Sequence, residues 1–260
     1  MKKVILSLLA IFTLASGFSW NNYGHQVVVK LAERHLTERA KENIRKYFDY
    51  DLAKEASWMD RHCNDKEILC TKSWHTFVAD QKSHYYDPGY RLEPGDALRG
   101  ILMADWNLSH YKTLTDSAVM MNIRMVIHFL GDMHCPSHCY FGPKTHYKVR
   151  IKEKDYKSFH ALYDMMGTIL HKERKGENID QCVEALDTAK KSEIKKIQKG
   201  SVYDWAKDCA DRIAVIFEWN PYGTYQLKDD TIERGEKMTD TQLQYAGYRL
   251  AKLLNNYFDK

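Results

Sequence analysis

The sequence has no long hydrophobic run, no strong excess of one charge and no CxxC pair, and each absence excludes a class of protein. Its longest apolar run, residues 4–15, covers about 12 residues, well short of the roughly 20 that cross a bilayer. Lys and Arg number 39 against 35 Asp and Glu, an excess too weak to indicate a nucleic-acid partner from charge alone. Without a CxxC pair, a thiolate zinc site of the finger type is not expected.

The composition is otherwise that of a globular protein, with 44% hydrophobic and 28% charged residues, which excludes the disordered and fibrous classes. No internal repeat or composition break divides the chain, and helical periodicity dominates it. We therefore predict a single-domain, all-α (mostly α) fold. Helices are expected after Gly24, from an N-cap at Thr37 to Tyr47, and over residues 52–61, 96–111, 117–133, 155–171, 179–189, 203–219 and 240–258. Residues 64–94 are expected to form a loop with at most one short strand.

The N-terminus has the features of a secretory signal peptide. Two lysines precede the apolar run, and the small residues Gly17 and Ser19 follow it at the positions typical of cleavage before Trp20. We therefore expect a signal peptide over residues 1–19 and one domain over residues 20–260. The cleaved protein would have no membrane span and would be secreted or periplasmic.

All six cysteines follow the expected cleavage point: Cys63, Cys70, Cys135, Cys139, Cys182 and Cys209. An oxidising compartment favours disulfides, and the close pairs Cys63–Cys70 and Cys135–Cys139 could each close a short loop. The alternative is that the six are free, mostly buried thiols. Residues 107–109 form a glycosylation sequon, which matters only in a eukaryotic secretory route.

The chemistry of the chain is concentrated in its histidines, of which there are 12. The expected helix 117–133 is apolar nearly all round, which indicates a central helix, yet it carries His128 and Asp132 one turn apart. A buried imidazole and carboxylate must pair with each other or bind something else. A satisfied core pair is the simpler explanation for these two residues alone, but His138 follows shortly after Pro136.

A second pair with the same spacing, His160 and Asp164, makes a metal site the better explanation. Imidazole and carboxylate are the ligands that zinc accepts when no thiolate is offered. A new α-amino group at a cleaved N-terminus is a further nitrogen ligand. The upstream candidates are Trp20, His25, Asp60 and His75.

The order of these residues resembles the zinc-dependent single-strand-specific nucleases of fungi and plants that also act as 3′-nucleotidases (the S-one/P-one nuclease type). Their fold is related to that of bacterial zinc phospholipase C. The matching motifs are residues 20–25 (WNNYGH), 56–60 (ASWMD), 74–75 (WH), 128–133 (HFLGDM), 136–138 (PSH) and 160–164 (HALYD). Beyond residue 164 the resemblance continues only as helical character.

The resemblance implies a helical domain around a cleft with three zinc ions. One zinc would be bound by Asp60, His75, His128 and Asp132. A second would be bound by the α-amine and carbonyl oxygen of Trp20, by His25 and by Asp132, which bridges the pair. The third, more open zinc would be bound by His138, His160 and Asp164. A water between the paired zincs would attack phosphorus, while the third zinc would stabilise the leaving 3′ oxygen.

Catalytic roles would then fall to Asp132, Asp60 and Arg61, and substrate contacts to Phe77, Lys148 and Arg150. The chain departs from the family pattern at three places. Cys63 stands where a basic residue is common, residues 147–152 contain no glycine, and Thr76 rather than an aromatic follows His75. These departures concern recognition of the base rather than the metal ligands.

The implied function is hydrolysis of single-stranded DNA, RNA and 3′-nucleotides to 5′-phosphate products, with no stable protein partner. The alternatives are a zinc phospholipase C, a phosphatase on other phosphate esters, and an inactive protein whose metals only hold helices together. His134 could orient a zinc ligand. The other histidines are expected to be structural or on the surface: His35, His62, His84, His110, His146 and His171.

Overall fold

The computed structural model describes residues 20–79, 95–140, 147–221 and 223–260. The helices and short helical turns are α1 (Asn22–Arg34), α2 (Glu38–Arg45), η1 (Leu52–Glu55), α3 (Trp58–His62), η2 (Leu69–Thr71), α4 (Ala97–Ser109), η4 (Tyr111–Thr113), α5 (Asp116–His134), α6 (Phe159–Gly167), η5 (Thr168–Arg174), α7 (Ile179–Leu186), α8 (Lys191–Ile197), α9 (Val202–Trp219) and α10 (Asp229–Phe258). The strands are β1 (Phe77–Val78), β2 (Cys139–Tyr140), β3 (Val149–Ile151) and β4 (Lys154–Tyr156). The expected signal peptide, His84 and His146 lie outside the described residues.

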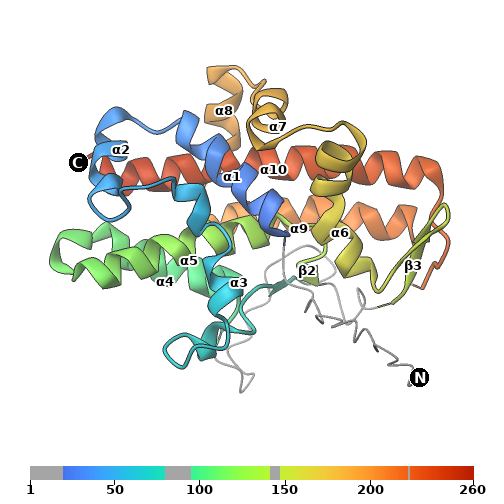
Figure 1. The fold of residues 1–260 in the computed structure, drawn as a ribbon, viewed down its shortest axis with the longest axis horizontal. Coiled ribbons are helices and arrows are strands. Elements are labelled where there is room, and N and C mark those ends of the chain that lie inside the picture. Colours follow the sequence, from blue (N-terminus) through green and yellow to red (C-terminus); the bar gives the residue numbers. More distant parts are fainter. Residues whose placement is uncertain (1–19, 80–94, 141–146, 222) are drawn as a thin grey trace, which may run out of the picture.

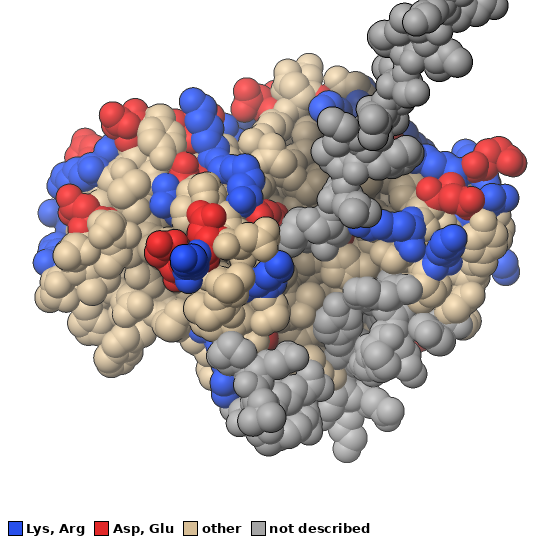
Figure 2. All heavy atoms as spheres, turned by 60° about the horizontal axis from the view of Figure 1, so that its bottom comes forward, with Lys and Arg blue, Asp and Glu red and all other residues tan. Residues whose placement is uncertain are grey.

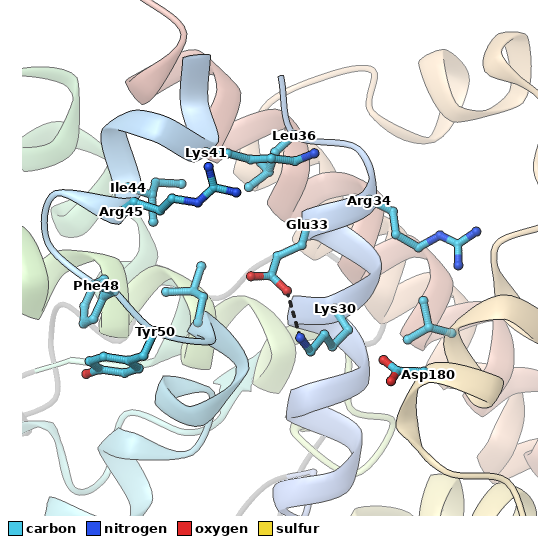
Figure 3. Close-up of a pocket in the computed structure, with 12 residues that line it drawn as sticks. Lys30, Glu33, Arg34, Leu36, Lys41, Ile44, Arg45, Phe48, Tyr50 and Asp180 are labelled. Carbon is cyan, nitrogen blue, oxygen red and sulfur yellow. Dashed lines mark ion pairs between the residues drawn. The ribbon is translucent and has the colours of Figure 1, made fainter. Parts of the chain in front are cut away.

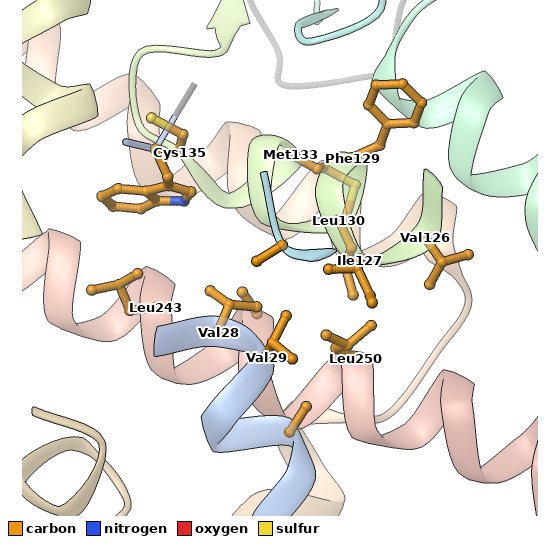
Figure 4. Close-up of a cluster of buried hydrophobic side chains, with 14 of the residues drawn as sticks. Val28, Val29, Val126, Ile127, Phe129, Leu130, Met133, Cys135, Leu243 and Leu250 are labelled. Atoms are coloured by element: carbon orange, nitrogen blue, oxygen red, sulfur yellow. The ribbon is translucent and has the colours of Figure 1, made fainter. Parts of the chain in front are cut away.

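Helices α5 and α10 form the centre of the molecule. Figure 1 shows α10 crossing its whole width, and α10 packs against α1, α2, α5 and α6. Every residue of α5 from Met125 to His134 is buried, as its apolar sequence predicts. In Figure 4, Leu130 of α5 faces Val29 of α1 and Leu250 of α10. The polar side chains of α5 are therefore held inside a close-packed apolar core.

Polar caps start the helices that carry the candidate ligands. The Asn21 side chain accepts a hydrogen bond from Gly24 N at the start of α1, Thr115 caps α5 and Ser158 caps α6. Such caps satisfy backbone N–H groups that have no partner within the helix. They define where each helix begins, and with it which way its histidine and aspartate face.

Two short sheets complete the fold. Strands β1 and β2 are parallel, with Phe77 opposite Cys139, whereas β3 and β4 form an antiparallel hairpin. The Phe77 N–H donates to the carbonyl of His138 over 2.9 Å. The β1–β2 pair therefore brings the segments with His75 and His138 together, although they are far apart in sequence.

The mostly α fold is confirmed, but three of the expected helices differ from the prediction. Residues 52–61 form two short pieces, η1 and α3, instead of one helix. Residues 155–171 are divided among β4, α6 and the π-helical η5. Helix α10 begins at Asp229 rather than near residue 240. Its first turns include Gly235, where an added Cβ would lie 2.9 Å from Tyr163 Oη. Packing on α6 holds a segment whose own sequence only weakly favours a helix.

All six cysteines lie in the described part of the chain, and the structure has them as free thiols, five of them buried. The expected Cys63–Cys70 and Cys135–Cys139 loops are therefore not closed by disulfides. Cys63 is buried in the core while Cys70 is exposed, so the first pair does not share an environment.

None of the described helices has the length and apolar character to cross a bilayer.

The close approach of α10 to α1 gives a stability prediction. A Cβ added at Gly247 would lie 2.6–2.8 Å from three side-chain atoms of Leu31. Gly247→Ala should therefore lower the free energy of unfolding by about 1–3 kcal/mol, measured by urea denaturation. Gly167→Ala is the matched control, because its Cβ would meet Leu243 at an ordinary 3.4 Å. A helical Gly→Ala change of that kind should be neutral or stabilise by about 0.5–1 kcal/mol. Equal unfolding curves for the two variants would contradict this packing.

Candidate metal centre

Eight histidine and aspartate side chains converge from six segments of the chain. They are His25 on α1, Asp60 on α3, His75 before β1, His128 and Asp132 on α5, His138 before β2, and His160 and Asp164 on α6. All are buried except Asp60, whose side chain is 11% exposed. The structure thus brings together every side-chain ligand that the sequence predicts.

Asp132 lies at the centre of this group and contacts four imidazoles. Its Oδ2 is 3.0 Å from His75 Nδ1 and 3.3 Å from His128 Nε2. Its Oδ1 is 3.4 Å from His25 Nε2 and 3.6 Å from His138 Nδ1. The two oxygens therefore face different histidines, as a carboxylate that bridges two cations would.

Asp60 joins the same cluster from α3. Its Oδ1 is 3.3 Å from His128 Nε2 and 3.5 Å from His75 Nδ1. Those two ring nitrogens are themselves 3.0 Å apart. Three donor atoms from three segments thus surround one point.

A second group lies between α6 and the turn before β2. His138 Nε2 is 3.3 Å from Asp164 Oδ1, and His160 Nε2 is 3.4 Å from Asp164 Oδ2. The two histidine rings have their centroids 4.7 Å apart. The Ser137 hydroxyl donates to Asp164 Oδ1 over 3.1 Å and so orients the carboxylate.

Backbone carbonyls fix the tautomers of two of these histidines. His128 Nδ1 lies 2.9 Å from the carbonyl of Ala56, and His138 Nδ1 lies 2.5 Å from the carbonyl of His75. A carbonyl only accepts, so each Nδ1 carries the proton. Each Nε2 then faces a carboxylate oxygen, so either a proton on Nε2 or a metal ion must lie between the two atoms.

The spacing of the donor atoms agrees with metal ligation. Two ligands of a tetrahedral zinc, with bonds of about 2.0–2.1 Å, lie roughly 3.3 Å apart. The separations between candidate ligand atoms around Asp60, Asp132 and Asp164 run from 3.0 to 3.5 Å. In addition, Asp60 Oδ1 and Asp164 Oδ2 are buried without a hydrogen bond of good geometry. A cation would satisfy both oxygens, so the residues fit divalent metals.

Charge within the cluster shifts the pKa values in opposite directions. Burial opposes ionisation of Asp132, but His128, His25 and His75 hold its pKa well below the usual value. Burial likewise opposes a charge on His128, but Asp60 and Asp132 raise its pKa to about 9. Burial and the neighbouring His128 lower the pKa of His25. Asp132 and Asp60, whose pKa is also lowered despite burial, mainly by His128, thus remain ionised and attract cations, whether protons or metals.

Trp20 is completely buried beside this cluster. A Cβ on Gly24 would lie 3.1 Å from Trp20, and a Cβ on Gly131 would lie 2.8 Å from His25 Nδ1. Both glycines therefore allow close approach. The next backbone N–H, that of Asn21, donates to the Asp164 carbonyl over 2.9 Å, which attaches the start of the domain to α6.

Phe77 does not lie where a base-stacking residue would. It is 1% exposed and packs in the core, because the strand pairing of β1 directs it inward. This corrects its expected role as a substrate contact.

Arg61 is exposed next to Asp60, and its Nη2 donates to the carbonyl of Lys54.

Lys148 and Arg150 belong to the β3–β4 hairpin region. Arg150 donates from Nε and Nη2 to both oxygens of Asp155, over 2.6 and 2.8 Å, and stacks on Tyr225. Lys148 is exposed. A phosphate could therefore bind Lys148 directly, whereas Arg150 would first have to break its ion pair with Asp155.

His134 points away from the candidate ligands. Its Nδ1 donates to the carbonyl of Leu130, and its Nε2 accepts from Arg249 Nη1 over 2.9 Å. Burial and Arg249 lower its pKa to about 3. His134 thus holds the end of α5 and does not orient a ligand directly.

Two side chains near Asp164 that the sequence reasoning missed lie in the turn between Asp132 and His138. Ser137 bonds Asp164, as described, and Cys135 Sγ lies 3.7 Å from Asp164 Oδ1. Both flank Pro136 inside the segment between two candidate ligands. Their place in that motif was the signal that could have identified them.

A third His-containing group has a different geometry. His171 lies 2.6 Å from Glu177 and 2.8 Å from Asp240, with Cys182 nearby. Although burial opposes it, pairing with Asp240, Cys182 and Glu177 raises the pKa of His171 to about 10. A separation of 2.6 Å is that of a hydrogen bond and is shorter than a tetrahedral edge at zinc. This group is a buried ion pair that joins η5 to α10.

A hollow in the described surface lies away from this cluster, between α1, α2, η1 and α7 (Figure 3). It measures about 580 Å³, and none of its lining residues belongs to the ligand cluster. Three of its four cations are paired: Lys30 with Glu33 and Asp51, Arg34 with Asp187, and Lys41 with Glu38. On the described part of the face in Figure 2, basic and acidic side chains are interspersed. Metal donors, rather than pocket shape or basicity, identify the site.

Fold and site together define a class: a mostly helical protein with buried His–Asp clusters able to hold several metal ions. The family model described as S1/P1 Nuclease matches residues 20–259, so the chain belongs to the S1/P1 nuclease family. The chain is also 23% identical over 291 residues to Endonuclease 2 of Arabidopsis thaliana, covering 98% of this chain and 96% of that protein. Family membership supports hydrolysis of phosphodiester bonds as the class of reaction.

The raised pKa of His128 gives a prediction about metal uptake. With a pKa of about 9 in the metal-free protein, the ring is protonated at pH 7, whereas a metal ligand must be neutral. Zn²⁺ binding should therefore release protons at pH 7, and apparent affinity should rise as pH increases towards 9. Calorimetry in buffers of different ionisation enthalpy measures the release.

The control is His110→Ala, a change of an exposed histidine at the end of α4. It should release as many protons as the unchanged protein, while His128→Ala should release fewer. A binding enthalpy that does not depend on the buffer would contradict the assignment.

Proposed function

We propose that this protein is a zinc-dependent nuclease and 3′-nucleotidase that hydrolyses single-stranded DNA, RNA and 3′-nucleotides to 5′-phosphate products. The observation that supports it most is the convergence of five histidines and three aspartates around shared points. Their donor atoms lie at the separations of ligands on one metal, as described above. Family membership supports the phosphodiester as the substrate class.

The ligand sets would be the three that the family resemblance implies. Asp60, His75 and His128 would hold one zinc, and His25 with the Trp20 amine would hold a second. Asp132, whose two oxygens face His75 and His25 respectively, would bridge these two. His138, His160 and Asp164 would hold the third.

Bound zinc would lower the pKa of a coordinated water towards neutrality and stabilise negative charge on phosphate oxygens. The chain would supply the fixed geometry for this chemistry. Carbonyls of Ala56 and His75 orient two imidazoles, and Ser137 orients Asp164. No side-chain nucleophile is required, and Arg61, exposed beside Asp60, would meet the substrate phosphate.

We further propose that export activates the enzyme and that the protein is secreted or periplasmic. The α-amino group of Trp20 becomes a free ligand only when the preceding peptide bond is cleaved. The burial of Trp20 against Gly24 and the Asn21–Asp164 hydrogen bond support a fixed position for this residue.

The test is an assay of purified protein on single-stranded DNA, RNA, 3′-AMP and phosphatidylcholine, with and without chelator. Chelator-sensitive release of 5′-mononucleotides or of adenosine would support the proposal. Turnover of phosphatidylcholine alone would instead indicate a phospholipase C. Turnover of simple phosphate esters alone would indicate a phosphatase.

Asp132→Ala should reduce activity more than any other single ligand change, by roughly a hundredfold or more, because two metals lose a ligand. Metal analysis should show fewer than three zinc ions per chain. Asp116→Ala, the same change at the exposed first turn of the same helix, should leave both values unaltered. An Asp132→Ala protein with three zincs and a normal rate would refute the bridging role.

Addition of one residue before Trp20 should abolish activity, since the extra peptide bond removes the amine as a ligand. Protein that begins at Trp20 is the control, and both forms should unfold at similar temperatures. Full activity and unchanged zinc content in the extended form would exclude the N-terminal ligand.

A further inference from the structure

We propose that the Cys135 thiolate is an additional ligand of the metal held by His138, His160 and Asp164. The inference rests on the proposed metal centre and concerns a residue outside the ligand set that the resemblance implies. It would give the third metal one sulfur donor, two nitrogen donors and one oxygen donor.

Distances support this assignment. Cys135 Sγ lies 3.7 Å from Asp164 Oδ1, and donor atoms of Cys135, His138 and Asp164 all lie within 4.8 Å of one another. With bonds of about 2.3 Å to sulfur and about 2.0 Å to oxygen, a tetrahedral edge is roughly 3.5 Å. The sulfur therefore lies where a ligand of the same ion would.

The backbone holds Cys135 in this place. It follows the last residue of α5, and its N–H donates to the Asp132 carbonyl over 2.9 Å. The His138 N–H in turn donates to the Cys135 carbonyl over 3.0 Å. Two successive turns thus direct Cys135 and His138 to the same point, next to Asp164.

The simpler explanation is that Cys135 is a small buried side chain that bonds Ser137 Oγ at 3.2 Å. Cys182 offers a direct comparison, because it is also buried and also lies near a histidine and a carboxylate. There His171 and Glu177 are 2.6 Å apart and hydrogen-bonded, so no metal separates them. Around Cys135 the corresponding pair, His138 Nε2 and Asp164 Oδ1, is also within hydrogen-bond distance, but its longer separation of 3.3 Å matches a tetrahedral edge at zinc.

Ligation by Cys135 would change the properties of the third metal. The thiol releases one proton to solvent as its sulfur binds, and thiolate ligands favour soft ions such as zinc over magnesium or calcium. Four protein ligands would complete a tetrahedral set, and a substrate oxygen would then bind as a fifth ligand, an expansion that zinc sites allow during reaction. This zinc should therefore be the last of the three to leave during chelation, and its loss should accelerate at least tenfold in Cys135→Ala.

X-ray absorption of the purified, zinc-loaded whole protein tests the assignment without a mutation. We expect one zinc–sulfur bond per three zincs, at about 2.3 Å. Cobalt substitution gives a second measurement, because a cobalt–thiolate bond adds a charge-transfer band in the near ultraviolet that imidazole and carboxylate ligands lack. Cys135→Ala and Cys135→Ser should lose this band, and Cys182→Ala, the matched control, should keep it.

Three bound metals without a sulfur neighbour in the unchanged protein would overturn the Cys135 proposal and leave the proposed function intact. A charge-transfer band that survives in Cys135→Ala would also overturn it. A protein that binds no metal at all would refute the metal centre itself and, with it, the proposed function. If Cys135→Ala fails to fold, the absorption measurement on the unchanged protein decides.

Discussion

Asp132 holds a negative charge inside the apolar core, and the structure around it follows from the need to compensate that charge. A buried carboxylate without a partner is strongly unfavourable, and here four imidazoles lie within 3.6 Å of its two oxygens. The same group that would destabilise an ordinary core thereby becomes a site of high affinity for cations. Either protons or metals can supply the compensation, and the donor spacing favours metals.

The fold provides this compensation from segments that are far apart in sequence. Helix α5 contributes His128 and Asp132, α1 contributes His25, α6 contributes His160 and Asp164, and the β1–β2 pair adds His75 and His138. Gly131 lets α1 come close enough for His25 to reach the carboxylate. Long α10 packs on α1, α5 and α6 and so keeps these elements in place. The helical bundle is in this sense a support for a small polar centre.

Membership of the S1/P1 nuclease family agrees with this polar centre. The charge and shape of the described surface, by contrast, do not indicate where a phosphate ester would bind. On the face shown in Figure 2, charges of both signs are interspersed. The hollow between α1, α2, η1 and α7 is lined in part by paired charges and contains none of the candidate metal ligands. Affinity for a phosphate ester would come from the metals and would need no basic groove. The turn from Cys135 to His138 would add a sulfur donor to an otherwise nitrogen–oxygen centre.

The sequence by itself determined the mostly α class, the central position of α5 and the eight side-chain ligand candidates. Helical periodicity and His–Asp spacing are local properties, and the motifs carried the family resemblance. Only the tertiary structure decided that Phe77 is buried, that Arg150 is paired with Asp155 and that α10 starts at Asp229. It alone brought Cys135 next to Asp164. These features depend on contacts between distant segments, and no local pattern encodes which side chains a strand pairing or a helix crossing will bring together.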